Sequence, residues 1–241
     1  MRKTVYAAGA VSMAAALAFA APAQAGGKHD GGRHHGDDAL LSVLHGVPGV
    51  TVDVWVNGKL TLDDFKPGKL AGPLKLEGGN YKIAVTASDA KSADDAVIGP
   101  VKVVLKEGRN YTAVAHLDED GDPTATLFKN DTSPSPRGEG KLTVRHVAAA
   151  PAVDVLAGKT PVIEDLENPE QEVLTLKAGK VSASVAAAGT TKPLIGPADI
   201  PVTAGKNTIV YAWGSLKKGN LGVAVQVVDS AKWRGHGGHG R

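Results

Sequence analysis

Short runs of alternating apolar and polar residues fill the chain from residue 39 onward. A period of two is typical of β-strands that bury one face. Turn signals such as Asn57-Gly58 and Asp120-Gly121-Asp122 separate the runs at short intervals, and no stretch has a helical period. The pattern predicts an all-β protein. The clearest runs contain Leu41 and Val43, then Val52, Val54 and Val56, then Ile83 and Val85, and then Val101, Val103 and Leu105.

One stretch occurs twice. LSVLHGVPGVTVDV, Leu41 to Val54, returns as LTVRHVAAAPAVDV, Leu142 to Val155. A repeat of this length is typical of self-contained domains in tandem. With about six or seven short strands each, the units are expected to be immunoglobulin-like antiparallel β-sandwiches. We place domain 1 at residues 39–131 and domain 2 at 141–229, with a Pro/Gly linker over 132–140.

The two ends of the chain differ from the repeat. Residues 1–25 combine a basic start, an Ala-rich apolar segment and an Ala-x-Ala site, which together predict a cleaved signal peptide. No later stretch is apolar enough to span a membrane. Residues 26–38 and 230–241 are expected to be flexible tails rich in glycine and histidine. We therefore expect a secreted, extracellular protein that can also associate non-covalently with the cell envelope.

Charge and composition exclude several functions. The 27 basic residues become 27 − 2 = 25 once Arg2 and Lys3 leave with the signal peptide, which equals the 25 acidic residues. This balance argues against nucleic-acid binding. The absence of cysteine excludes disulfides and thiolate sites. Since no nucleophile elbow or phosphate-binding glycine loop occurs either, we expect no enzymatic activity.

Three motifs carry a family resemblance. These are the LxVxHxxxxxxxDV opening, the Leu-x-x-Gly-x-x-Ile/Val strand entry, and Gly-x-Asn-Tyr-Thr-Ala-Val from Gly108. With them the chain resembles the bacterial exported domain-of-unknown-function family 4397, in two tandem copies covering nearly all of residues 40–229. The resemblance implies an exported β-sandwich and no established activity. Unit 2 departs from the motifs at residues 147–149 and at Thr208, which stands in place of Tyr111.

A histidine and an aspartate recur at the same spacing in both units. They are His45 with Asp53, and His146 with Asp154. A histidine near a carboxylate can serve as a general base or hold a metal. Alternation instead places each histidine at the edge of the core, where buried polar groups need hydrogen-bond partners. We therefore interpret the two pairs as structural.

Further candidates lie in the tails and loops. Tail imidazoles can capture Zn²⁺, Cu²⁺ or Ni²⁺, although incidental histidines in a solvated tail are the alternative. Trp55, beside Asp53, can point outward from its strand and contact a ligand. Alternatively its strand is covered on both faces, or Trp55 is a lone exposed aromatic. The acidic turn over residues 118–122 can bind Ca²⁺ or be a solvated turn. The tail histidines are His29, His34, His35, His236 and His239.

The sequence therefore predicts a secreted, non-enzymatic interaction module. Its partner is expected to be an envelope or extracellular protein or polymer, and edge strands also permit self-association. No cofactor is expected beyond a divalent transition metal. Metal capture by the histidine-rich termini is the alternative function, and a hydrolase that uses the His/Asp pairs ranks third.

Overall fold

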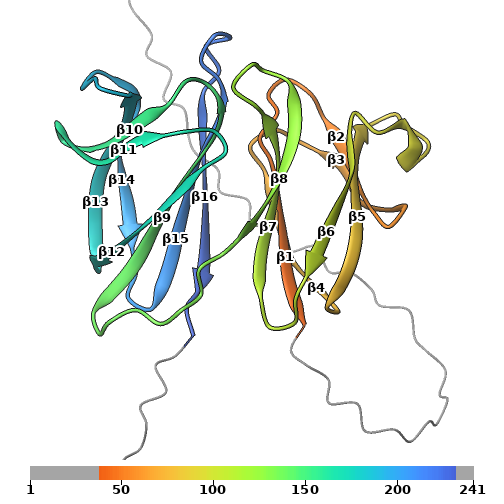
Figure 1. Ribbon diagram of the computed structural model, residues 1–241, viewed down its shortest axis with the longest axis horizontal. Coiled ribbons are helices and arrows are strands. Elements are labelled where there is room, and N and C mark those ends of the chain that lie inside the picture. The colour runs from red at the N-terminus through yellow and green to blue at the C-terminus, as the bar shows by residue number, and fades with distance from the viewer. Residues whose placement is uncertain (1–37, 232–241) are drawn as a thin grey trace, which may run out of the picture. The chain divides into compact units, whose positions relative to one another are not determined.

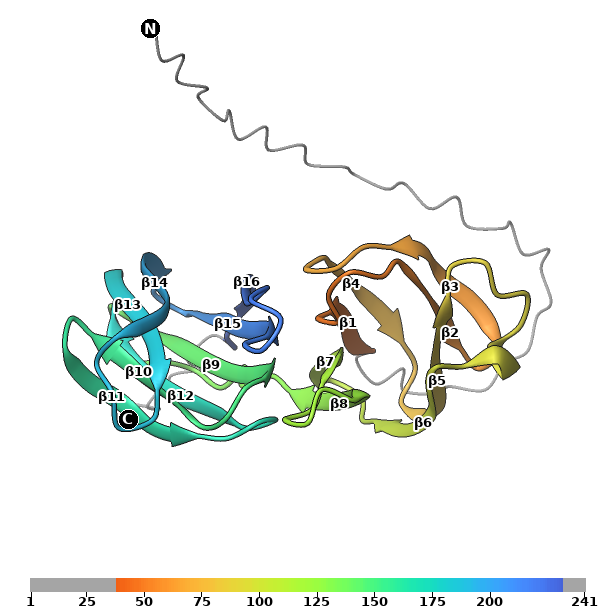
Figure 2. The ribbon, with the colours of Figure 1, turned by 90° about the horizontal axis from the view of Figure 1, so that it is seen from above.

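The computed structural model describes residues 38–231, and these form two β-sandwiches (Figure 1). This confirms the predicted fold class. In the first sandwich, one sheet has the strand order β4-β1-β7-β8 and the other β3-β2-β5-β6, and Figure 2 shows them as two layers. The strands are β1 (Ala39–His45), β2 (Val52–Val56), β3 (Lys59–Phe65), β4 (Leu70–Leu76), β5 (Gly79–Ala87), β6 (Ile98–Leu105), β7 (Asn110–Leu117) and β8 (Pro123–Lys129), with a 3₁₀ turn η1 (Ala93–Asp95) before β6.

The second sandwich repeats this topology strand for strand. Its sheets have the orders β12-β9-β15-β16 and β11-β10-β13-β14. The described residues contain no helix long and apolar enough to cross a membrane. The strands are β9 (Glu139–Ala149), β10 (Val153–Ala157), β11 (Thr160–Leu166), β12 (Gln171–Lys177), β13 (Gly179–Ala187), β14 (Pro193–Val202), β15 (Lys206–Ser215) and β16 (Gly222–Asp229).

Two details differ from the expected immunoglobulin-like arrangement. Each sandwich has eight strands divided four and four, whereas a constant-type immunoglobulin domain has seven. The sheets are also not fully antiparallel, because β1 runs parallel to β7 and β9 runs parallel to β15. Alternation reports which face of a strand is buried and carries no information on the direction of its neighbour.

Each sandwich has its own core between its two sheets. Leu41 and Val43 from β1 meet Val52 and Val54 from β2 in the first core. Leu142, Val144, Val153 and Val155 occupy the matching places in the second. The repeated stretch therefore supplies one strand to each sheet, and its alternating apolar residues bring the sheets together.

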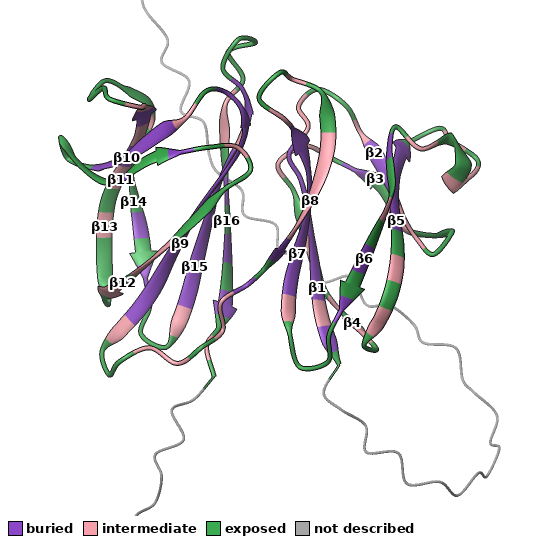
Figure 3. Ribbon diagram, in the orientation of Figure 1, coloured by how far each residue is buried: buried purple, intermediate pink, exposed green. Residues whose placement is uncertain are grey.

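A third apolar cluster joins the sandwiches, which lie within one compact unit. It is built from the outer faces of the sheets that contain β1 and β9, and Figure 3 shows how fully β7, β9 and β15 are buried. A strand that is buried on both faces is covered by another layer of the protein on each face of its sheet. The members are Leu44, Val114 and Phe128 from the first sandwich and Val147, Ile209, Tyr211, Ala224 and Val228 from the second, with Trp213 packed against them.

The ring of Trp213 packs closely against Gly68 at this junction. A Cβ on Gly68, in the turn between β3 and β4, would lie 2.7 Å from the Trp213 ring, and Gly68 has a φ of +72°. We expect Gly68→Ala to lower the free energy of unfolding by about 2–4 kcal/mol, from backbone strain plus overpacking. Urea denaturation measures this effect.

Gly58 provides the matched control for this substitution. Its φ is +77°, yet no atom of residues 38–231 lies within 4 Å of the place that a Cβ on Gly58 would occupy. Gly58→Ala should therefore cost only the strain of the backbone, about 1 kcal/mol. Equal losses for the two variants would contradict close packing of Trp213 on Gly68.

Candidate functional site

The two repeated histidines hold loops in place. His45 is buried, its Nε2 lies 2.9 Å from the Val50 carbonyl oxygen, and its ring packs against Phe65. His146 is also buried, with Nε2 3.1 Å from the Pro151 carbonyl oxygen. Each ring thus closes the loop that connects the first two strands of its sandwich. Burial lowers the pKa of both imidazoles, so both are neutral at physiological pH.

The repeated aspartates perform a different structural task. Asp53 accepts a hydrogen bond from the Asp64 amide at 2.9 Å, and Asp154 accepts one from the Asp165 amide at 3.0 Å. Both donors have positive φ, 50° and 53°, at a register shift in the neighbouring strand. The carboxylate satisfies an amide that the irregular pairing leaves without its usual partner.

The histidine and the aspartate of each unit are therefore hydrogen-bonded to the backbone and not to each other. His45 ends β1 in one sheet, Asp53 lies on β2 in the other, and the hydrogen bonds of each go to backbone groups. The equal spacing in the two units reflects the repeated architecture. Among the described residues, these pairs make no base–carboxylate arrangement that could activate water.

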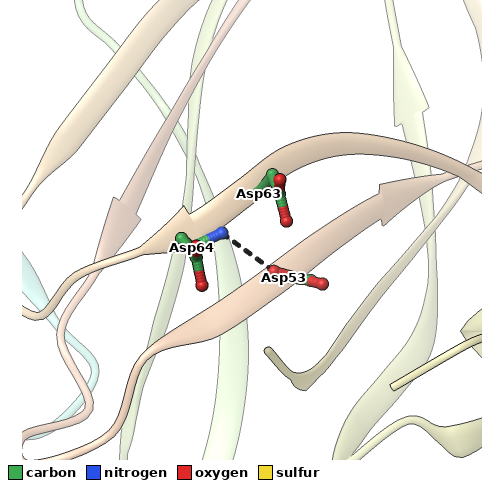
Figure 4. Close-up of side chains that lie close together, drawn as sticks. All are labelled: Asp53, Asp63 and Asp64. Carbon is green, nitrogen blue, oxygen red and sulfur yellow. Dashed lines mark hydrogen bonds between the residues drawn. The ribbon is translucent and has the colours of Figure 1, made fainter. Parts of the chain in front are cut away.

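Asp53 is one of three carboxylates that lie close together (Figure 4). Oxygen atoms of Asp53, Asp63 and Asp64 lie within 4.8 Å of one another, a separation that could suit a hard cation. Burial raises the pKa of Asp53, and the charges of Asp63 and Asp64 add to the rise. Two of the three side chains are exposed, and Asp53 already accepts the Asp64 amide. The hydrogen bonding favours a structural role for the cluster.

The remaining predicted residues are placed as follows. Trp55 is half-buried, and its indole nitrogen donates to the Thr86 hydroxyl at 3.0 Å, which fixes the ring against its own sheet. In the acidic turn, Asp118 accepts from the amides of Gly121 and Asp122, which is how an aspartate stabilises a tight turn. His29, His34, His35, His236 and His239 lie outside the described residues.

A buried arginine at the junction of the sandwiches was missed by the sequence reasoning. Arg145, on β9, has no exposed surface. Its guanidinium donates to Asn130 Oδ1, Gln171 Oε1 and Tyr211 Oη at 2.7 to 2.8 Å. It also lies 4.3 Å from the centroid of the Phe128 ring. Arg145 therefore joins side chains of both sandwiches without a carboxylate partner among the described residues.

The polar network continues from this arginine across the junction. The Tyr211 hydroxyl donates to Gln226 Oε1, and Gln226 Nε2 donates to the Ser42 hydroxyl at 3.1 Å. Thr112 of β7 also donates to Gln226 Oε1, at 3.0 Å. One sequence signal points to this network: when the two repeats are aligned, Arg145 occupies the position of the apolar Leu44.

A groove of about 790 Å³ lies beside the network, between the first sandwich and β16. Leu40, Ser42 and residues of β4 line one side, and residues of β16 from Val225 onward line the other. Three valines of β16 are exposed although they alternate with buried residues. This groove and its valines form the candidate binding surface. The exposed fractions are 42% for Val223, 46% for Val225 and 52% for Val227.

Fold and surface together define a protein of two packed β-sandwiches, in which the repeated polar residues stabilise loops and an edge strand exposes apolar side chains. Residues 39–156 match the family described as Domain of unknown function (DUF4397), which supports the resemblance for this region. The match covers the first sandwich and continues through β9 and most of β10. No curated protein matches the chain.

Proposed function

We propose that the protein is an exported, non-enzymatic module that binds another macromolecule outside the cell or in the cell envelope. The exposed valine stripe on β16 is the observation that carries this proposal, because apolar side chains gathered along one surface strand are typical of interaction sites. The backbone hydrogen bonds of His45, His146, Asp53 and Asp154 support a non-enzymatic role. Export rests on the signal-peptide pattern of residues 1–25.

The second sandwich is, in this proposal, a second copy of the same family. Support comes from the repeated opening stretch, Leu41 to Val54 and Leu142 to Val155, and from the identical strand order of the two sandwiches. Tandem copies that pack face to face leave fewer surfaces free for a partner. The binding role is therefore assigned to the edges of the sheets.

A binding experiment tests the function. Immobilised purified protein, without its signal peptide, is exposed to cell-wall polymer, membrane and culture-supernatant fractions, with heat-denatured protein as the control. We expect saturable retention of a component from at least one fraction by the folded protein alone. If folded and denatured protein retain the same components from every fraction, the interaction role fails.

Metal capture by the termini is the second candidate function. His45, His116 and His146 are all buried and bonded to protein groups through their rings, so imidazole binding of a metal would fall to the tails. We expect Zn²⁺ or Cu²⁺ to bind the full mature chain in calorimetry and binding to be lost when residues 26–37 and 232–241 are deleted. Undiminished binding by the deletion variant would contradict this candidate.

A further inference from the structure

The eight edge strands of the four sheets are not equally protected against pairing. Irregular register interrupts the edges formed by β3, β4, β6, β11 and β14. Irregular pairing, prolines and charges are the usual means by which proteins keep sheet edges from adding strands. The three edges with regular register are β8, β12 and β16.

Among these three, β16 alone is both regular and apolar on its exposed face. The strand β12 carries the charged Glu172 and Lys177, and β8 contributes Ala125 and Leu127 to the first core. Leu127 pairs with Ala113 as Val225 pairs with Val210, so the two positions are equivalent. In the second sandwich this position is 46% exposed. The second sandwich therefore exposes on β16 a position that the first sandwich partly buries on β8.

The backbone of β16 is also available on one side. Its ladder of eight residue pairs joins it to β15, and the other side faces no strand within the described residues. Between Gly222 and Val228 it contains neither proline nor a charged residue. A regular, uncharged edge of this length offers a row of amide and carbonyl groups to an incoming strand.

The residues that line the groove beside β16 indicate the chemistry of its ligand. Leu70 and Lys75 line it from opposite ends of β4. Arg109 also lines it, beside Leu40, which is the register partner of Lys75. Both cations are exposed, and the ion pairs in the described part of the chain involve neither of them. Two carboxylates also line the groove: Asp229 is paired with Lys206, and Asp38, next to Leu40, is exposed and outside the ion pairs of the described residues. Two cations therefore stand against one carboxylate outside the ion pairs, a balance that favours an acidic group on the ligand.

From these observations we infer that β16 binds an extended segment of a partner polypeptide by strand addition. The segment pairs its backbone with the free edge of β16, packs alternating apolar side chains on the valine stripe and along the groove, and places an acidic end against Lys75 and Arg109. The inference rests on the proposed interaction role and specifies the partner as a polypeptide in extended form.

Peptide probes test the inference on the full mature chain. The probe is a labelled eight-residue peptide, matched to the length of β16, that alternates valine and threonine and carries a pair of glutamates at one end, made in both orientations. Fluorescence anisotropy measures its binding. We expect one orientation to bind, and the same peptide with N-methylated backbone amides to bind about tenfold more weakly because it cannot complete the ladder.

Substitutions in the protein assign the site. Val225→Lys with Val227→Lys should weaken probe binding by about tenfold or more, because lysines on the strand remove its apolar contacts and charges on an edge strand disfavour strand addition. Val104→Lys is the matched control, since Val104 is an exposed strand valine of the other sandwich. Lys75→Glu with Arg109→Glu should weaken the acidic probe and favour a probe that carries lysines instead. Thermal melting confirms that each variant is folded.

Four results would overturn the inference. The first is equal binding of the probe to wild-type protein and to the Val225→Lys, Val227→Lys variant, and the second is equal binding of the N-methylated probe. The third is a wild-type dimer in light scattering that this variant abolishes, since a second copy would then occupy β16. If the variant still retains the component captured from cell fractions, strand addition fails while the interaction role stands.

Discussion

Replacing Arg145 by alanine should lower the free energy of unfolding by about 3–5 kcal/mol, the largest loss we expect from one substitution in this chain. The side chain is fully buried and donates hydrogen bonds to Asn130, Gln171 and Tyr211. Its removal takes the guanidinium donors from two buried acceptors, Asn130 Oδ1 and the Tyr211 hydroxyl, and opens a cavity beside Phe128, whereas Gln171 is exposed. Each unsatisfied buried group costs about 1–3 kcal/mol, so the losses accumulate.

Urea denaturation followed by tryptophan fluorescence measures the loss. Arg137→Ala is the control, because Arg137 is exposed in the segment between the sandwiches and should change stability by less than about 0.5 kcal/mol. Arg145→Lys separates charge from geometry. Lysine keeps the charge but cannot reproduce the planar set of donors, so most of the loss should remain. A loss below about 1 kcal/mol for Arg145→Ala would contradict the central role of this network.

The position of Arg145 also shows why the junction was hidden from sequence reasoning. Alternation along β9 correctly identifies Leu142 and Val144 as facing the second core. Thr143 and Arg145 alternate with them and lie on the opposite face of β9. Both are polar and would face solvent in an isolated sandwich, yet both are buried. A second folded unit covers them, and the local pattern of a strand carries no record of such a partner.

The equal His/Asp spacing in the two units has a related explanation. Eight residues separate His45 from Asp53 in sequence, but the loop between them carries the chain from one sheet to the other. Two copies of one fold must repeat whatever holds their loops and irregular strand pairs, so repetition alone does not identify a catalytic site. The hydrogen-bond partners are backbone groups, which no side-chain motif reveals.

Acid should destabilise this protein steeply below about pH 6.5, because three buried histidines must gain protons to become charged. Burial lowers the pKa of His45, His116 and His146, whereas the unfolded chain restores values near 6.5. Between the unfolded and folded values the unfolded state binds more protons, so stability falls as pH falls. The stability that the neutral, buried imidazoles contribute is fully present above the unfolded pKa, and it is lost as the pH falls from that value through the folded pKa.

The size of the effect follows from the number of groups involved. Each histidine that is protonated only in the unfolded state adds a slope of about 1.4 kcal/mol per pH unit, so three together approach about 4 kcal/mol per unit. Asp53 acts in the opposite sense, because burial raises its folded pKa. Urea unfolding at intervals from about pH 8 to about pH 5 measures the slope across the relevant window.

Glutamine substitutions separate the contributions, since glutamine can hydrogen-bond but does not titrate. His116 is a suitable first choice because its ring contacts the Leu117 carbonyl and the Thr126 hydroxyl, both at 2.9 Å. His116→Gln should reduce the slope by about 1.4 kcal/mol per pH unit, whatever its effect at neutral pH. His116→Gln, His146→Gln and His45→Gln combined should make stability nearly independent of pH in this window. A slope that persists in the triple variant would show that groups other than these imidazoles take up the protons.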